Sequence, residues 1–554
     1  MKILDAPKTR FVFYLFLFVV INLLQSNFTG LFEDEAYYWI WSKDLDWGYF
    51  DHPPLVALWA AVGSSMFSGE LGIRFVSALS FSGLIWVLWQ CVDVPNKWEK
   101  MDLFFGLLFS LAFLQIFGFI VTPDTPLLFF FALFLLSYKN FLKKQSVVTG
   151  LFLGLTMAGM LYSKYHGILI IGFVCLSNLS LFKSSYFWFA SLFGAILFVP
   201  HLYWQYENGF PSFVYHLQDR SKKPYHITNT LTHLVNVIAV VGLTFPFVYK
   251  AFFRSPARTA FERGLKWIVY GFFFFFLVST MNSQPQAQWL IATLPPLLLI
   301  SFTYFREHSS KWLNRLIWIQ ASILLVGRLF FAFPSISPLP LETHLAQQWV
   351  PELKEATKSQ PLVFVNSYRN ASVYEFYTGI KSHSYSILRG RKSQYNLKDF
   401  EHRMQGENVF AVSKFMEGSP ELMRKTTTPF FGKPIDNYTT FEKVHCIILK
   451  DSHLFVPGEN KITFDIINNY PKKITFEQTE FVGVFLGKKN KIIKKINLVS
   501  GDINDLEEGG KRTVTASFNL NEVPVEAIEF RIGLDFYGMQ EGYQGNKISV
   551  IRED

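Results

Sequence analysis

The sequence predicts a polytopic α-helical membrane protein, followed by an α/β domain and a terminal β-sandwich. Three observations lead to this prediction. Half of the 554 residues are hydrophobic and only 17% are charged, whereas about a quarter is usual in soluble domains. Long apolar runs fill residues 1–333, and short alternating runs fill residues 451–554. We therefore expect a transmembrane domain at 1–333, an α/β domain at 334–450 and a β-sandwich at 451–554.

Apolar runs long enough to cross a bilayer recur about 11 times in the first domain. The run at 55–67 is either a further span or a re-entrant segment. The first run follows Lys2, Lys8 and Arg10 and lacks a small-residue cleavage site, so we interpret it as an uncleaved span. The predicted spans are 11–27, 71–90, 102–121, 125–138, 147–162, 167–182, 186–204, 231–249, 265–280, 289–305 and 316–333.

The basic residues between these spans predict the orientation. With a cytoplasmic N-terminus, the inner loops carry seventeen Lys and Arg residues and the outer loops carry five. This bias follows the positive-inside rule, so the C-terminal domains are expected on the outer side. It also accounts for the net charge of +9 without a nucleic-acid partner. The three cysteines are scattered and form neither a disulfide framework nor a metal motif.

The second half of the chain changes character after residue 333. Residues 342–358 have a helical pattern, Pro361–Asn366 reads as a buried strand, and Ala371–Tyr377 suits a short helix. From Asp451 onward the runs KITFDII, FVGVFLG, KIIKKINLV, TVTASFNL and AIEFRIGLDF alternate in polarity, and turn residues separate them. Short strands at this spacing predict a β-sandwich. The sandwich either binds a glycan or a protein, or caps the α/β domain.

An acidic and aromatic loop between the first two apolar runs is the strongest candidate for a reaction site. A loop that only joins two helices needs neither carboxylates nor aromatic rings, whereas both suit a sugar-like substrate at a membrane surface. Its acidic residues are Glu33, Asp34, Glu35, Asp44, Asp46 and Asp51. Its aromatic residues are Tyr37, Tyr38, Trp39, Trp41, Trp47, Tyr49 and Phe50.

Two further outer loops carry ionisable residues beside apolar spans. Asp124 lies between two spans and either caps a helix or takes part in chemistry. The Lys164 side chain either extends towards the membrane–water interface or binds substrate. His166 is either solvated or functional. Together these loops suit group transfer from a lipid-phosphate donor. A carboxylate would act as the base on an acceptor hydroxyl, while Lys164 and Arg74 would hold the leaving phosphate.

These same motifs resemble a known family. The stretch FEDEAYYWIWSKDLDWGYFDHPPL, then GIRFVSALS, TPDTPLLFF, GLTMAGMLYSKYHGIL and QAQWLIATLPPLLL, resembles the bacterial protein-mannosyltransferase-like group of the GT-C superfamily. This group of integral-membrane glycosyltransferases includes relatives of dolichyl-phosphate-mannose-protein mannosyltransferase and the lipid A aminoarabinose transferase. VFVNSYRNASVYEFYTG and LRGRKSQYNL resemble the group's outer domain. The resemblance covers residues 10–450 and not the last hundred.

The resemblance implies an inverting transfer of a sugar from a polyprenyl-phosphate carrier, such as undecaprenyl phosphate, at the outer side of a bacterial inner membrane. The acceptor would be lipid A, a surface glycan or a protein hydroxyl. The implied catalytic residues are Asp34 as general base, with Glu35 and Asp124. The implied substrate-binding residues are Tyr37, Tyr38, Asp51, His52, Arg74, Lys164, His166, Gln288 and Trp289. The family often has a histidine where this chain has Gln288, so an acid or metal-binding role at that position is in doubt.

Two alternatives stay open at this stage. A transporter or flippase of lipid-linked sugars is the competing function, although the charged residues gather at one face and not at the bilayer midplane. The metal requirement is also open. No metal ligand is assigned, but Asp34, Glu35 and Asp124 could form an oxygen site for Mg²⁺ or Mn²⁺.

Overall fold

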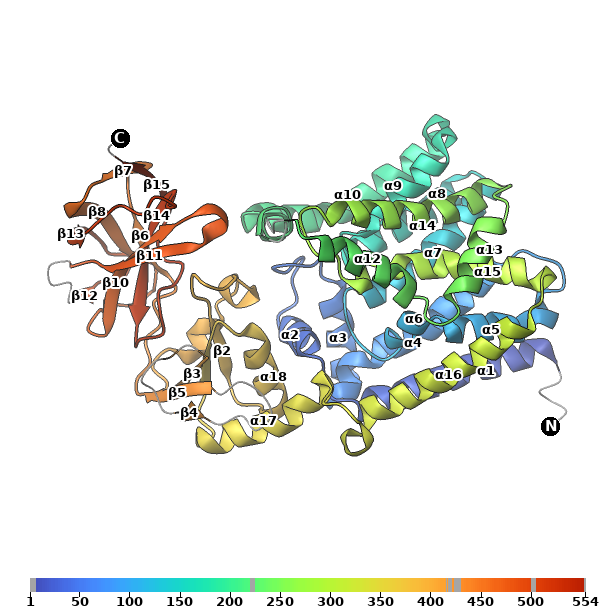
Figure 1. Cartoon of the computed structure of the whole chain (residues 1–554), viewed down its shortest axis with the longest axis horizontal. Helices are drawn as coiled ribbons and strands as arrows, with labels where there is room; N and C mark the ends of the chain where they lie inside the picture. The colour runs from blue at the N-terminus through green and yellow to red at the C-terminus, as the bar shows by residue number, and fades with distance from the viewer. Residues whose placement is uncertain are drawn as a thin grey trace. The chain divides into compact units, whose positions relative to one another are not determined.

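The computed structural model describes residues 6–219, 225–414, 416, 421–422, 430–499 and 505–552. These residues divide into two compact units, Met1–His344 and Leu345–Asp554. Figure 1 shows the helical first unit in blue to yellow and the strand-rich second unit in orange to red. Each unit is described by itself.

The first unit is a bundle of apolar helices. Six helices are long and apolar enough to cross a membrane by length and composition: α1, α4, α7, α10, the segment Ala287–Glu307 and α16. Three shorter helices, α3, α8 and α9, are also apolar. The helices are α1 (Pro7–Phe28), α2 (Glu33–Ser42), α3 (Leu55–Met66), α4 (Gly69–Cys91), α5 (Met101–Ser110), α6 (Ala112–Ile116), α7 (Asp124–Lys143), α8 (Val147–Ser163), α9 (Gly167–Ser177), α10 (Ser185–Glu207), α11 (Pro211–Val214), α12 (Ile227–Ala239), α13 (Phe245–Arg254), α14 (Ala260–Ser279), α15 (Leu294–Glu307) and α16 (Lys311–Ala332).

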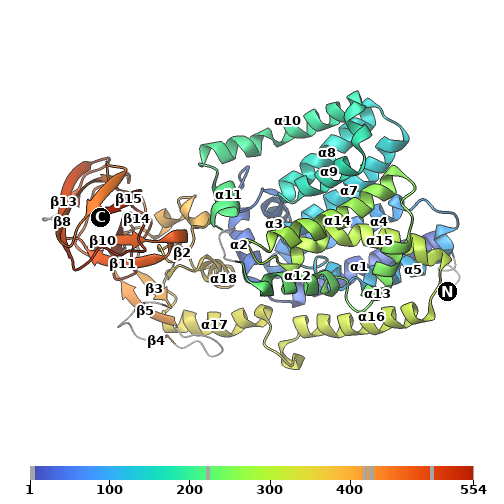
Figure 2. The same ribbon diagram turned by 45° about the horizontal axis from the view of Figure 1, so that its top comes forward.

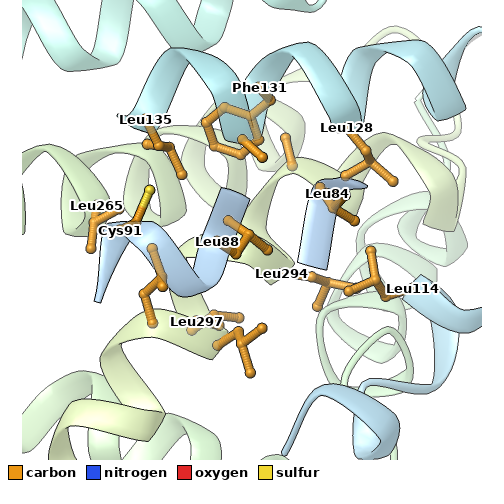
Figure 3. Packing of buried hydrophobic residues seen from close by; sticks show 14 of the residues in the cluster. Leu84, Leu88, Cys91, Leu114, Leu128, Phe131, Leu135, Leu265, Leu294 and Leu297 are labelled. Atoms are coloured by element: carbon orange, nitrogen blue, oxygen red, sulfur yellow. The ribbon is translucent and has the colours of Figure 1, made fainter. Parts of the chain in front are cut away.

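The interior of the bundle is formed by leucine and phenylalanine side chains from helices far apart in the sequence. Figure 3 shows Leu84, Leu88 and Cys91 of α4 packed among residues of α7, α14 and α15. Leu84 and Leu88 are at most 1% exposed. Burial of a large aliphatic side chain contributes about 1.5–3 kcal/mol. This core holds α4 and α7, which carry the candidate site residues Arg74 and Asp124 near their N-terminal ends.

Helices occur in all the predicted spans, but the α-helix in the span 167–182 ends at Ser177, and two other spans break near their middle. The span predicted at 102–121 breaks at Leu111, between α5 and α6, and the span at 231–249 breaks between α12 and α13. The second break contains Gly242, whose φ of +82° lies in the left-handed region. The helix α3 has 12 residues, which is too short to cross a bilayer core of about 30 Å. The number of crossings therefore stays a prediction.

A single glutamine side chain bonds to the backbone at both breaks. Gln320 of α16 donates from Nε2 to the carbonyl oxygens of Ser110 and Val241, and its Oε1 accepts the amide proton of Leu243. Gln320 is 3% exposed. Interrupted helices are tolerated at membrane depth where a neighbouring side chain bonds the freed backbone groups. Figure 2 shows α16 running along the edge of the first unit, where it provides this side chain.

The second unit contains one mixed sheet and a β-sandwich whose sheets are mostly antiparallel. The mixed sheet has the strand order β2-β1-β3-β5-β4, in which β1 pairs in parallel with β2 and β3. Helices α17 (Glu342–Ala356) and α18 (Tyr368–Thr378) accompany it. Its strands are β1 (Leu362–Val365), β2 (Ser382–Tyr385), β3 (Val409–Ser413), β4 (Glu421–Leu422) and β5 (Phe430–Ile435). The predicted helices at 342–358 and 371–377 and the strand at 361–366 are confirmed.

The predicted β-sandwich is also confirmed. One sheet has the order β11-β10-β14-β15-β7, and the other has the order β13-β8-β6. Phenylalanines from the two sheets meet, as in Phe464 of β8 and Phe481 of β10, whose ring centroids are 5.6 Å apart. The strands are β6 (Val444–Ile447), β7 (Ser452–Phe455), β8 (Gly458–Asn468), β9 (Ile474–Thr475), β10 (Thr479–Leu486), β11 (Ile492–Asn497), β12 (Asp505–Leu506), β13 (Lys511–Leu520), β14 (Glu529–Phe536) and β15 (Lys547–Arg552).

The predicted boundary at residue 451 falls inside a continuous core. The strand β6 precedes this boundary but pairs with β8 of the sandwich. One hydrophobic cluster contains Val363 of the mixed sheet together with Phe464 and Phe530 of the sandwich. The division of the second unit into two domains therefore stays a prediction.

A buried acidic group lies within this second unit. Glu401 is 3% exposed, and its Oε2 accepts hydrogen bonds from Thr440 Oγ1 at 2.8 Å and Tyr470 Oη at 3.0 Å. Burial, and then the neighbouring Glu442, raise the pKa of Glu401 from 4.5 to about 7. The folded chain therefore keeps this carboxyl protonated at pH values where the unfolded chain has released the proton.

We expect Gln320→Leu to lower the free energy of unfolding of the first unit by about 2–4 kcal/mol, because two carbonyls and one amide are left buried without partners. Thermal unfolding in detergent micelles measures this change. Ile319→Leu, on the exposed side of the same helix, is the matched control. An unchanged unfolding temperature for Gln320→Leu would contradict the bridging role.

We expect the stability of the second unit to fall by about 1–3 kcal/mol between pH 4.5 and pH 7, because Glu401 ionises in the unfolded chain while the folded chain still keeps it protonated. Glu401→Gln should remove this part of the pH dependence and be the more stable form above pH 7. Hydrogen exchange of β6 and β8 in the full chain, followed in urea, measures both. If the two proteins show equal pH dependence, ionisation of Glu401 does not limit stability.

Candidate active site

The acidic loop folds into the first turn of α2. Glu33, Asp34 and Glu35 occupy this turn, where the helix macrodipole favours negative charge. The backbone amide of Phe32 donates to Glu35 Oε2 at 3.0 Å, which closes the turn. Glu35 is fully buried, whereas Asp34 is partly exposed. The two neighbouring carboxylates therefore have different environments.

The buried member of this pair forms an ion pair with Arg74. Glu35 and Arg74 side chains have no exposed surface, and Arg74 Nε donates to Glu35 Oε1 at 2.8 Å. Arg74 Nη1 also donates to the carbonyl oxygens of Ser26 and Thr29 at the end of α1. This arrangement suits a positioning role for both residues, in addition to the catalytic and phosphate-binding roles that the family resemblance implies.

Glu35 also brings the second acidic position next to the first. The amide of Val121 donates to Glu35 Oε1 at 2.9 Å, and Val121 lies three residues before Asp124. Asp124 is the first residue of α7. The start of α2 is therefore hydrogen-bonded to the segment that leads into α7.

Asp124 forms a second buried ion pair, with Lys164. Lys164 Nζ lies 2.8 Å from both Asp124 Oδ1 and Asp124 Oδ2. The side chains are 7% and 8% exposed, so the pair is shielded from solvent but reaches the surface of the bundle. Lys164 directly follows the C-terminal end of α8, where the macrodipole favours a cation. The sequence predicted both residues for the site, and the structure joins them.

An aromatic cluster surrounds the start of α2. The rings of Trp41 and Tyr49 stack with centroids 4.6 Å apart, and Tyr37 and Tyr38 each lie 4.9 Å from Trp41. His52 lies 6.2 Å from Tyr38. The hydroxyl of Tyr49 donates to the carbonyl of Trp41 at 3.1 Å, and burial raises the pKa of Tyr49, so its hydroxyl stays neutral. These rings are packed on one another and fix the shape of the loop.

Polar residues in the second half of α10 and in the segments that follow it form hydrogen bonds to this loop. These residues were not predicted from the sequence. His201 Nδ1 lies 2.7 Å from the carbonyl oxygen of Trp47, and Ser212 Oγ donates to the carbonyl of Tyr49 at 3.0 Å. His216 Nε2 lies 2.9 Å from the carbonyl oxygen of predicted site residue Asp51, which is 8% exposed. An ionisable residue inside an apolar span, as His201 is, was the available signal.

The same region reaches the loop that contains Lys164. Tyr165 Oη lies 3.0 Å from His201 Nε2 and accepts from Gln205 Nε2 at 3.0 Å. The Tyr165 ring lies 5.9 Å from the His216 ring. The acidic loop, the Lys164 loop and the end of α10 are therefore one connected structure.

The remaining predicted residues form a neighbouring aromatic group. The ring of His166 lies 5.8 Å from Trp289 and 5.5 Å from Phe276. Trp289 belongs to η5 (Ala287–Thr293), next to Gln288, whose Nε2 donates to Gln286 Oε1 at 2.8 Å. The structure thus brings together His166 and Trp289, and His166 lies two residues after Lys164 in the sequence.

Two of the three predicted acidic positions, Glu35 and Asp124, already have cationic partners. Both oxygens of Asp124 face the Lys164 ammonium, and both oxygens of Glu35 accept from Arg74 and backbone amides. An ion would have to displace these cations. No group of three or more His, Cys, Asp or Glu side chains that could hold a metal occurs among the described residues.

Comparison with known proteins finds similarity over part of the chain. The profile of the dolichyl-phosphate-mannose-protein mannosyltransferase family matches residues 51–204. Lipid A galacturonosyltransferase RgtD of Rhizobium johnstonii is 27% identical over 208 residues, which are 36% of this chain and 43% of the relative. The matched stretch is thus less than half the length of that curated relative.

The fold is that of two solved structures of ArnT from Cupriavidus metallidurans. The apo structure has a TM-score of 0.54 and 14% identity, and covers 76% of this chain and 98% of ArnT. The structure bound to undecaprenyl phosphate has a TM-score of 0.55 and 15% identity, with 76% and 97% coverage. The chain is a multi-pass membrane protein whose sequence is similar in part to the dolichyl-phosphate-mannose-protein mannosyltransferase family and to lipid A galacturonosyltransferase RgtD, and whose fold is similar to that of ArnT.

Proposed function

We propose that the chain is an inverting glycosyltransferase that moves a sugar from a polyprenyl-phosphate carrier to a hydroxyl group at the outer face of a bacterial inner membrane. The buried Asp124–Lys164 pair beside the first turn of α2 is the observation that supports this proposal most directly. Two relatives also support the proposal. RgtD is named as a lipid A galacturonosyltransferase, and ArnT has been solved bound to undecaprenyl phosphate.

Asp34 is the proposed general base. It is the partly exposed carboxylate of the first turn of α2, and its neighbour Glu35 is occupied by Arg74. In the proposed step, the acceptor oxygen attacks the anomeric carbon while Asp34 takes the hydroxyl proton. The bond from the anomeric carbon to the phosphate oxygen breaks, and one displacement inverts the anomeric configuration.

Lys164 is the proposed partner of the leaving phosphate. An ammonium held in a shielded position stabilises the negative charge that develops on the phosphate oxygen. Lys164 bonds to Asp124, so donor binding would share or replace this carboxylate partner. Asp124 would then be released to orient the acceptor, as the family resemblance implies.

The proposed orientation places this end of the bundle outside. Lys and Arg residues concentrate in the loops at the opposite helix ends, which the positive-inside rule assigns to the cytoplasm. The acceptor is proposed to be lipid A, with another surface glycan or a protein hydroxyl as alternatives. A transporter of lipid-linked sugars is the competing function from another class.

We expect Asp34→Asn to lower kcat by about 10²–10⁴-fold, because it removes the base and keeps the side-chain shape. The measurement is the loss of extracted polyprenyl-phosphate sugar, followed by mass spectrometry with purified protein and lipid A. Asp44→Asn, in the same loop, is the matched control. Turnover of Asp34→Asn at the wild-type rate would exclude this mechanism. Translocation of intact donor by the wild type, without sugar transfer, would favour the transporter.

We expect transfer to continue in excess EDTA, because the Asp124 and Glu35 carboxylates are already neutralised by Lys164 and Arg74. The measurement is the rate of donor loss with EDTA and after adding back Mg²⁺ or Mn²⁺. Abolition by EDTA and recovery with one cation would instead indicate a metal-dependent site.

A further inference from the structure

A short segment of the second unit is held rigidly between two neighbouring parts of the chain. In residues 387–392, the amide of Leu388 donates to the carbonyl of Glu541 at 3.0 Å. The carbonyl of Gly390 accepts from Tyr543 Oη at 2.8 Å. A Cβ atom on Gly390 would lie 1.5 Å from Asn366 Oδ1, so a larger residue here would require the Asn366 side chain to move.

This segment gathers basic side chains around two tyrosines. The Arg391 guanidinium lies over Tyr368, 4.6 Å from the ring centroid, and donates to its hydroxyl. Lys392 lies over Tyr543 at 5.3 Å. We call this region the basic–tyrosine surface, which consists of Tyr368, Arg369, Arg389, Arg391, Lys392 and Tyr543.

The fold alone does not require all of these charges. Arg389 is exposed and has no hydrogen bond, ion pair or ring contact among the described residues. Arg369 and Lys392 are exposed as well. The nearby acidic residue Glu541 is 3% exposed at its side chain and pairs with Lys495 at 2.6 Å. The six residues of the surface thus include four basic side chains and no acidic one.

We infer that the basic–tyrosine surface binds the phosphorylated sugar head group of an anionic glycolipid, and so holds the acceptor. This inference rests on the proposed function. Guanidinium groups bind phosphate through paired hydrogen bonds, and tyrosine offers an apolar ring face and a hydroxyl to a sugar. A protein partner is disfavoured, because the cores of protein interfaces are mostly apolar and this surface includes none of the exposed large apolar residues described in the second unit.

The test measures binding of a soluble probe to the full chain in phosphatidylcholine nanodiscs. The probe is the deacylated, bis-phosphorylated glucosamine disaccharide of lipid A. We expect Arg389→Ser with Lys392→Ser to weaken binding about five- to tenfold, and added salt to reduce this difference by screening. The charge-matched control is Lys461→Ser with Arg512→Ser, at exposed positions of β8 and β13, and should bind within about twofold of the wild type.

Three results would overturn the inference. The first is an equal loss of disaccharide binding in the two double variants. The second is that the wild type binds the dephosphorylated disaccharide as tightly as the phosphorylated one. The third is that the wild type binds an acidic polyglutamate peptide as tightly as the disaccharide or more tightly, which would indicate a protein partner. The inference would also be contradicted if inorganic phosphate competed for the surface as well as the disaccharide does. The surface would then be a simple anion-binding site.

The test separates this inference from the proposed function. Asp34→Asn should bind the disaccharide like the wild type, because the base lies outside the basic–tyrosine surface. In the transfer assay, the Arg389 and Lys392 double variant should raise KM for the acceptor about five- to tenfold and leave kcat within about twofold. Disaccharide binding without any transfer would refute the proposed function alone.

Discussion

The ion pair between Glu35 and Arg74 is the interaction on which the rest of the site depends. Two fully buried charges are costly unless each finds enough partners. Arg74 meets this requirement with Glu35 and the carbonyl oxygens of Ser26, Thr29 and Gly30, and Glu35 adds the amides of Phe32 and Val121. The pair therefore fixes the end of α1, the start of α2 and the approach to α7 in one arrangement. Removing either partner would leave a buried charge and loosen all three segments.

Helix ends supply the electrostatics that this arrangement then uses. Carboxylates lie at the starts of α2 and α7, and Lys164 follows the end of α8. Each charge has the sign that the adjoining macrodipole favours. Asp124 and Lys164 can thus share a shielded position without extra partners. Such a pair keeps an ammonium available for a phosphate while limiting the cost of burying it.

Polar side chains inside the first unit serve architecture as well as chemistry. Gln320 bonds the backbone at two interrupted helices. Arg328, on the same helix, donates to Asn22 Oδ1 at 2.9 Å and to the carbonyl oxygen of Gln115 at 3.1 Å. These contacts join α16 to α1 and α6. An ionisable or amide group at membrane depth therefore marks a functional site only after its backbone partners have been considered.

The sequence by itself determined the features that depend on local pattern. Apolar run length predicted the helices, alternation predicted the strands of the sandwich, and the acidic and aromatic loop indicated the site. Only the tertiary structure decided which carboxylate is buried. Asp34 and Glu35 are adjacent but point roughly 100° apart on α2, and the partner of Glu35 lies 39 residues away. The breaks at Leu111 and Gly242 and the contacts of His201 and His216 depend equally on distant partners. Hydrophobic periodicity records which face of a segment is buried, but not which distant group meets it there.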